Sequence, residues 1–290
     1  YGPRKVVKLL ANRWTSNNQD IRKKDSIASL IFLIIGAMGK PKNKASKPFS
    51  IYGLNGAIEL LQSEKFQIES IFIQEGSQAE RNKWIIDYKK KHDKKMSILS
   101  KHVFKNQFSS KRTQGIVVQF SGDIISEELP SFSDEETVCL LVLDQIEDPQ
   151  NFGQIIRTAE CAGVDGILFS KHHSASISDT VLQVSQGAFL NMPLYEVTNL
   201  NNEFYALKEQ GFWIAGLENS IEAKSWHQID YKGKIIIIVG SEGEGIREKV
   251  LEACDFKATI PMMGKTNSLN VSAAVSAILF ERLRQVESGE

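Results

Sequence analysis

The second half of the chain contains short segments in which almost every residue is apolar. Residues 138–144 read VCLLVLD and residues 235–239 read IIIIV, and the segments GILFS, PLYEV and WIAGL lie between them. Successive side chains of a strand point to opposite faces of a sheet, so a strand that is apolar throughout must be buried on both faces. Apolar residues at helical spacing separate several of these segments. Residues 137–290 are therefore predicted to form a mostly parallel sheet covered by helices.

Three helices and one tight loop are expected in this region. Residues 151–163 and 246–254 have helical patterns, and GSEGEG at 240–245 is a glycine-rich loop. The last helix falls within residues 268–285. Its apolar face would consist of Val271, Ala274, Val275, Ile278 and Leu279.

Charge is distributed very unevenly along a chain whose formal net charge is zero. Residues 1–120 contain 23 basic and 9 acidic side chains, whereas residues 121–290 contain 12 basic and 26 acidic ones. The first part, with a net charge of +14, is typical of a protein that binds a polyanion. The second part, with a net charge of −14, is not.

Composition shifts divide the chain into four stretches: 1–47, 48–121, 122–136 and 137–290. The second stretch is predicted to be a small α/β domain, with a helix near Leu54–Leu61, a strand ending at Gly76, a lysine-rich helix over Arg81–Lys95 and a strand over Thr113–Phe120. The third stretch is acidic and polar and is the best linker candidate.

The first stretch is basic and contains a run of 12 mostly apolar residues at 27–38. A membrane span needs about 20 such residues, so no membrane association is expected. A flexible extension and a targeting segment both remain open interpretations.

Cys139, Cys161 and Cys254 lie far apart in the sequence and form no CxxC pair. A disulfide scaffold and a cysteine zinc site are therefore not expected, and a reducing, cytoplasmic location fits best. The adjacent His172 and His173 lack the spacing of metal ligands, so no metal site is expected.

The GSEGEG loop does not have the spacing of a dinucleotide fingerprint, which is G-x-G-x-x-G. Glu242 and Glu244 would repel a pyrophosphate, so the loop favours a ligand that is neutral or cationic. A glycine-rich turn without a ligand is the alternative.

Two polar groups are further candidates for chemistry. Asn151 is expected to cap the helix that follows the first apolar strand, and Arg157 lies in its second turn, where it could bind phosphate or stabilise an oxyanion. A surface salt bridge is the alternative for Arg157. Ser268 and Asn270 precede the final helix, and either could simply be its N-cap.

Three segments in fixed order carry a family resemblance: DPQNFGQIIRTAECAG, IVGSEGEGIRE and IPMMGKTNSLNVSAAVSAILFE. They resemble the motifs of the SpoU (TrmH-type) 2′-O-ribose RNA methyltransferases. IYGLNGAIELL and TQGIVVQ resemble the substrate-binding domain that precedes the catalytic domain in part of that family. The resemblance implies a trefoil-knotted α/β domain of the SPOUT type that binds S-adenosylmethionine (AdoMet) and forms a homodimer. It also implies a small ribosomal-protein-like domain that binds RNA.

The resemblance also implies site residues. Those implied for the cofactor are Gly240, Ile260, Leu269, Leu217, Gly216 and Met262, and those implied for catalysis are Arg157, Asn151, Glu242, Ser268 and Asn270. Arg157 would bind the neighbouring phosphate and stabilise a developing alkoxide, since a guanidinium is a poor base. Glu242 would hold Arg157 or the loop. The base is left open.

The expected reaction is methyl transfer to a ribose 2′-OH, most like the members that modify a guanosine of large-subunit ribosomal RNA. A transfer RNA substrate and a non-catalytic RNA-binding relative remain alternatives. A nicotinamide-dependent oxidoreductase is disfavoured, because no glycine fingerprint follows the first strand.

Overall fold

The computed structural model describes residues 47–108, 113–126, 128–219 and 223–288, and Pro48–Glu290 forms one compact unit. The predictions for the basic extension and its apolar run lie outside the described residues, apart from Lys47. Among the residues that are described, no helix combines the length and apolarity that crossing a bilayer requires.

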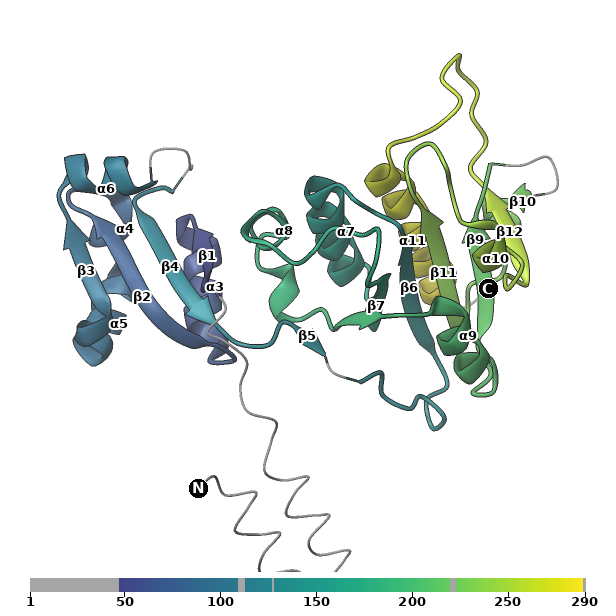
Figure 1. Cartoon of the computed structure of the whole chain (residues 1–290), viewed down its shortest axis with the longest axis horizontal. Coiled ribbons are helices and arrows are strands. Elements are labelled where there is room, and N and C mark those ends of the chain that lie inside the picture. The colour runs from purple at the N-terminus through teal and green to yellow at the C-terminus, as the bar shows by residue number, and fades with distance from the viewer. Residues whose placement is uncertain (1–46, 109–112, 127, 220–222, 289–290) are drawn as a thin grey trace, which may run out of the picture. The chain divides into compact units, whose positions relative to one another are not determined.

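The first part of the unit is built on a four-stranded sheet of order β1-β4-β2-β3 (Figure 1). Its strands are β1 (Phe49–Tyr52), β2 (Gln67–Gln74), β3 (Met96–Leu99) and β4 (Ile116–Ser121). Its helices are α3 (Leu54–Ser63), α4 (Gln78–Arg81), α5 (Lys83–His92), the 3-10 turn η1 (Asp93–Lys95) and α6 (Lys101–Phe108). The predicted small α/β fold is present, with β3 and α6 as elements that the sequence analysis did not anticipate.

The single lysine-rich helix predicted over 81–95 is wrong. Asn82 adopts an extended conformation between α4 and α5, and its side chain accepts a hydrogen bond of 3.2 Å from the Ile85 amide. An asparagine that satisfies a free amide in this way starts a new helix. The lysines are thereby concentrated on α5 and η1.

The second part is an eight-stranded sheet of order β10-β12-β9-β11-β6-β7-β8-β5, in which every described pairing is parallel. Its strands are β5 (Ile125–Ser126), β6 (Val138–Asp144), β7 (Gly166–Ser170), β8 (Leu194–Val197), β9 (Trp213–Leu217), β10 (Lys224–Ser225), β11 (Lys234–Gly240) and β12 (Phe256–Thr259). Its helices are α7 (Pro149–Cys161), α8 (Asp179–Val184), α9 (Leu200–Lys208), α10 (Glu248–Leu251) and α11 (Val271–Ser288), with 3-10 turns η2 (Ala188–Leu190) and η3 (Trp226–Gln228). The helix predicted over 246–254 is thus only one turn, α10.

Both faces of this sheet are buried, which confirms the prediction of a parallel sheet covered by helices. Alternate residues of β6 belong to different cores: Leu141 packs in one cluster with Ile155 of α7 and Ile278 of α11, and Leu140 packs in another with Phe204 of α9. A strand between two such cores gains burial from every side chain.

The acidic stretch 122–136 contributes to the fold as well as connecting the domains. Its β5 pairs with β8 at the edge of the sheet, and Phe132 is buried against Phe212 with ring centroids 5.7 Å apart. The linker prediction missed this, because the four large apolar residues of this polar segment are irregularly spaced and give no periodic signal.

We predict that Gly153→Ala destabilises the fold by about 1–3 kcal/mol, the range for overpacking. A Cβ at this position of α7 would lie 2.6 Å from the Val184 Cβ and 2.7 Å from the Val181 carbonyl oxygen of α8. Urea unfolding measures the loss. The control is Gly264→Ala, where a Cβ meets nothing within 4 Å. Equal unfolding midpoints for the two variants would contradict this account of the α7–α8 contact.

Candidate active site

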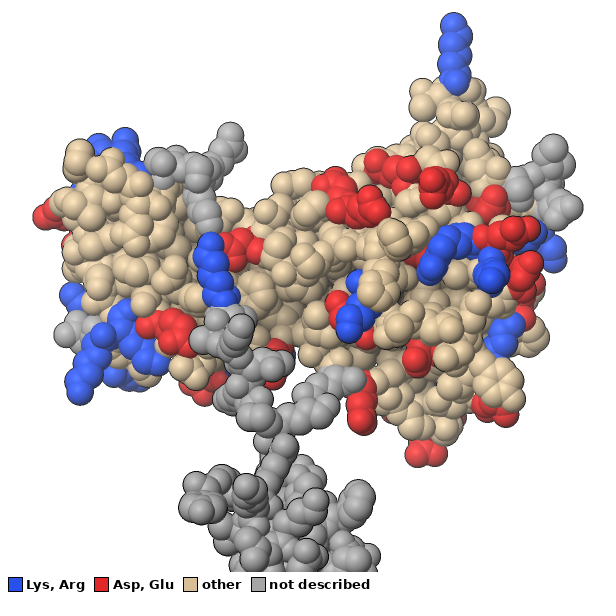
Figure 2. Space-filling view, in the orientation of Figure 1, with Lys and Arg blue, Asp and Glu red and all other residues tan. Residues whose placement is uncertain are grey.

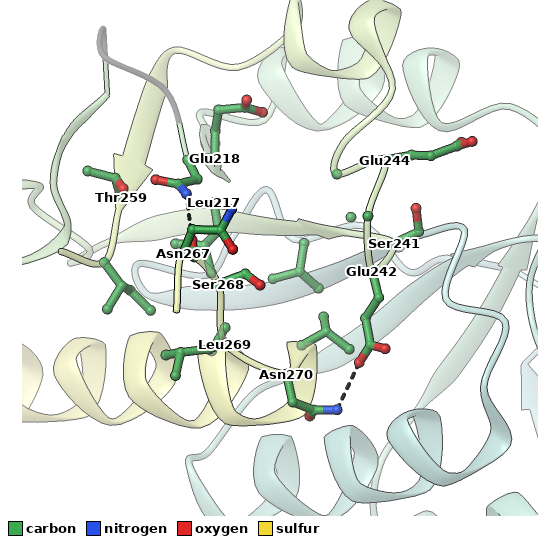
Figure 3. Close-up of a pocket in the computed structure, with 18 of the residues that line it drawn as sticks. Leu217, Glu218, Ser241, Glu242, Glu244, Thr259, Asn267, Ser268, Leu269 and Asn270 are labelled. Carbon is green, nitrogen blue, oxygen red and sulfur yellow. Dashed lines mark hydrogen bonds between the residues drawn. The ribbon is translucent and has the colours of Figure 1, made fainter. Parts of the chain in front are cut away.

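A cavity of about 650 Å³ opens where the carboxyl ends of β9, β11 and β12 approach the start of α11 (Figure 3). Parallel strands bring their carboxyl ends to one edge of a sheet, which is where open α/β sheets bind ligands. The lining residues are Leu217–Asn219, Val239–Gly245, Thr259, Ile260, Met262, Asn267–Val271 and Ala274.

The loop after β11 closes on itself. Ser241 and Gly245 exchange two backbone hydrogen bonds of 3.1 Å, and Gly243 and Gly245 have φ angles of 99° and 72°. A Cβ on Gly240 would lie 2.0 Å from the Gly245 carbonyl carbon. The glycines therefore fold the loop tightly and present its backbone to the cavity.

An ion pair between a buried carboxylate and a half-exposed arginine anchors the far end of this loop. The fully buried Asp144, at the end of β6, accepts hydrogen bonds from the Arg247 backbone amide (2.9 Å) and Nε (2.8 Å). The Arg247 Nη2 lies 2.6 Å from Asp144 Oδ1 and donates to the Ser170 hydroxyl at 3.3 Å. Sequence reasoning missed both partners, although Arg247 stands directly after the glycine loop.

Three of the predicted catalytic residues meet at the cavity. Glu242 Oε1 accepts hydrogen bonds from Asn151 Nδ2 at 2.9 Å and from Asn270 Nδ2 at 2.8 Å, and Asn270 Nδ2 lies 3.0 Å from Asn151 Oδ1. Figure 3 shows Glu242 and Asn270 reaching toward each other from the loop and from the start of α11. Asn151, Glu242 and Asn270 thus form one polar cluster, although Glu242 and Asn270 lie 91 and 119 positions from Asn151 in the sequence.

Helix capping positions these side chains, but the assignment of Asn151 as an N-cap is wrong. Asp148 caps α7 by accepting from the Gln150 amide, and Pro149 occupies the first turn. The buried Asn151 is therefore free to turn toward Glu242. Asn270 does cap α11, because its Oδ1 accepts from the Ser272 amide at 2.9 Å.

Of the residues predicted to bind the cofactor, five line the cavity: Gly240, Ile260, Leu269, Leu217 and Met262. Gly216 does not. It lies within β9, where a Cβ would come 2.8 Å from the Cys254 Sγ. Burial raises the pKa of the Cys254 thiol to about 12, so this cysteine packs as a neutral group.

The other two catalytic candidates have different surroundings. Ser268 lines the cavity beside Leu269. Arg157 does not line it: its side chain is exposed and borders a second hollow with Glu160 and Cys161. Within one chain, the structure does not bring Arg157 to the polar cluster.

The electrostatics of the cavity favour a cation. Glu218, Glu242 and Glu244 line it, and none of its described lining residues is a lysine or arginine. Leu217, Ile260 and Leu269 add apolar surface. No group of three or more potential metal ligands occurs in the described part of the chain. A cationic organic molecule with an apolar portion matches this lining, and the positive methionine group and adenine ring of AdoMet meet both requirements.

Comparison with known proteins identifies both parts of the unit. The SpoU rRNA Methylase family model matches residues 139–280, and the model for RNA 2′-O ribose methyltransferase substrate binding matches residues 50–123. The 23S rRNA (guanosine-2′-O-)-methyltransferase RlmB of Shewanella oneidensis is 35% identical over 243 residues, which cover 82% of this chain and 98% of that protein.

Solved structures show the same fold. The SpoU methyltransferase AviRb from Streptomyces viridochromogenes, in complex with AdoMet, superposes with a TM-score of 0.70 at 19% identity, over 88% of this chain and 97% of that one. The AdoMet-bound rRNA methyltransferase from Sinorhizobium meliloti gives a TM-score of 0.66 at 22% identity, over 83% of this chain and 88% of that one.

We predict that Arg247→Met lowers the free energy of unfolding by about 2 kcal/mol, because the fully buried Asp144 carboxylate loses its cation and keeps only the hydrogen bond from the backbone amide of residue 247. Adding Asp144→Asn restores part of the loss, since no charge is then stranded. Urea denaturation of the single and double variants measures this coupling. Lys208→Met is the control: its acidic partner Asp255 is 24% exposed, whereas Asp144 is fully buried, so the loss is at most about 1 kcal/mol. Equal losses for Arg247→Met and Lys208→Met would contradict the anchoring role.

Proposed function

Because the chain belongs to the SpoU rRNA methylase family, we propose that it transfers a methyl group from AdoMet to a ribose 2′-OH of RNA. The observation that carries the proposal is the cavity. It joins a backbone-lined loop, three carboxylates and the Asn151–Glu242–Asn270 cluster at one edge of a parallel sheet.

The chain's own residues fit AdoMet. Leu217, Ile260 and Leu269 would contact the apolar part of the molecule, and the carboxylates would balance its net positive charge. When bound, AdoMet supplies a methyl carbon that its sulfonium makes electrophilic. The task left to the protein is to orient the ribose and remove one proton.

The polar cluster is suited to this task. The Asn151 and Asn270 amides both donate to Oε1 of Glu242, and Oε2 takes no part in these two hydrogen bonds. Amides and guanidinium groups do not accept a proton at neutral pH, whereas a carboxylate does. We therefore assign Glu242 as the acceptor of the 2′-OH proton and Ser268 as a hydrogen-bonding group for the ribose.

Arg157 would bind the phosphate next to the target ribose and stabilise the developing alkoxide. Since it does not line the cavity of its own chain, we propose that the enzyme is a homodimer in which Arg157 of the partner subunit completes each site. The surface of α11 supports a partner: Phe280 and Val286 are exposed on it, Phe280 to 49%. An isologous dimer would bury the same helix on both copies.

The substrate that we propose is a guanosine of large-subunit ribosomal RNA, in keeping with the matched relative and with the substrate-binding match at residues 50–123. A transfer RNA ribose is the second candidate, because the positive charge of the first part of the chain would attract either RNA. Action on ribosomal RNA fits the cytoplasmic location expected from three free cysteines.

Mapping ribose methylation in ribosomal and transfer RNA from cells with and without the gene tests the function. One 23S ribosomal guanosine should lose its 2′-O-methyl group when the gene is absent. A loss of methylation confined to transfer RNA would identify transfer RNA as the substrate instead. No change in either RNA would overturn it.

We predict that Glu242→Gln lowers the rate of methyl transfer at least about 100-fold, as removal of a general base does. The glutamine oxygen can still accept the two asparagine amides, so the cluster keeps its shape. AdoMet affinity should remain within a few-fold. Single-turnover assays and calorimetry separate the two effects, and a rate near wild type would exclude Glu242 as the base.

We predict that Arg157→Ala abolishes turnover while AdoMet affinity stays within a few-fold. Co-expression of this variant with Glu242→Gln distinguishes the two possible placements of Arg157. If Arg157 acts on the partner's site, mixed dimers contain one intact site, and about a quarter of the activity returns. If it acts within its own chain, the mixture stays inactive and the shared-site proposal fails.

A further inference from the structure

Helix α5 carries a row of stacked rings that the catalytic account does not use. Trp84, Tyr88 and His92 stand four residues apart, so they lie on one side of the helix. The Trp84 and Tyr88 ring centroids are 5.1 Å apart with planes at 22°, and those of Tyr88 and His92 are 4.3 Å apart at 23°. The three rings are therefore stacked nearly parallel.

The row runs from the domain core to the surface. Trp84 and Tyr88 are half-buried against the core, and partial burial, together with the nearby Glu64, raises the pKa of Tyr88. His92 is exposed at the last position of α5. A ring that is packed from beneath and open above offers a preformed flat surface at little cost in side-chain entropy.

Lysines flank this row. Lys83, Lys91 and Lys94 are exposed, and Figure 2 shows basic side chains gathered over the part of the molecule that contains α5. The acid on the helix, Asp87, is paired with Lys90 at 2.8 Å. The surface thus combines positive charge with an exposed ring.

We propose that this α5 platform, defined as Trp84, Tyr88, His92, Lys91 and Lys94, binds an unpaired stretch of the substrate RNA. A base stacks on His92, and the neighbouring phosphates contact Lys91 and Lys94. The inference rests on the proposed function, because it takes RNA to be the substrate.

Ring chemistry favours unpaired RNA over other polyanions. Bases in a duplex already stack on one another and expose only phosphates, whereas a loop or bulge leaves a base face free for an aromatic ring. An acidic peptide would use the lysines but not the stacked row. The net charge of −14 over residues 121–290 also means that the catalytic domain repels phosphate, so basic groups elsewhere on the chain must bind the RNA.

Fluorescence anisotropy of the full chain with two labelled RNAs tests the platform. One RNA is a hairpin with a large loop of unpaired adenosines, and the other is the same stem as a blunt duplex. His92→Ala should weaken hairpin binding about tenfold, the scale of one lost base stack, and leave duplex binding unchanged. His92→Phe keeps a ring and should restore binding.

Charge and stacking are separated by salt dependence. Lys91→Ala with Lys94→Ala should reduce the slope of log affinity against log salt by roughly 1.4, the value for two contacts to a single strand. His92→Ala should leave that slope unchanged. The controls are His102→Ala and the pair Lys101→Ala with Lys105→Ala, which remove the same groups from exposed positions of α6.

Equal effects of the α5 and α6 variants, or equal loss of hairpin and duplex binding in His92→Ala, would overturn the platform. So would wild-type hairpin affinity in a His92→Ala protein whose helix content is intact by circular dichroism. These results leave the proposed function standing if methyl transfer persists. Absence of methyl transfer by the wild type overturns the function but not a measured stacking effect.

Discussion

The pairing of β6 with β11 is the constraint on which the site depends. The two parallel strands are in register from Lys234 opposite Val138 to Gly240 opposite Asp144. This places the end of β6, the start of α7 and the glycine loop side by side. Asp144 then holds Arg247, and Asn151 meets Glu242, because both connections leave the same edge. The polar cluster follows from strand register rather than from proximity in sequence.

The two parts of the chain divide the electrostatic requirements of the proposed reaction. Among the described residues, those that line the cavity include carboxylates but no basic side chain, which suits a cationic methyl donor but repels a phosphate backbone. The first part of the chain holds the opposite charge. An enzyme must bind both a cation and a polyanion at this reaction centre. It gains when the carboxylates that attract the cation and the basic side chains that attract the polyanion lie on different domains.

The sequence predicted the parallel sheet well, because strands such as IIIIV are apolar at every position and only a doubly covered sheet buries them. It was less informative where polarity is mixed. The break at Asn82, the short β5 and the capping of α7 by Asp148 each depend on a single side-chain contact, which periodicity does not record.

For the candidate site, the motifs identified Asn151, Glu242 and Asn270, which the fold then brings together. They did not reveal that Arg157 points away from the cavity or that Gly216 makes room for Cys254 rather than for a ligand. A side chain's direction depends on which face of its element is covered. The pairing of Asp144 with Arg247 could not be predicted from local sequence patterns, because the two residues lie 103 positions apart.

The proposed function requires the cavity at the ends of β9, β11 and β12 to bind AdoMet. Calorimetric titration of the full chain with AdoMet, beside the Gly240→Ala variant, tests it most directly. A Cβ at Gly240 displaces the 241–245 loop, so we expect saturable heat from the wild type and none from the variant. No heat from the wild type at millimolar AdoMet, even with ribosomal RNA present, or equal affinity in both proteins would contradict the claim.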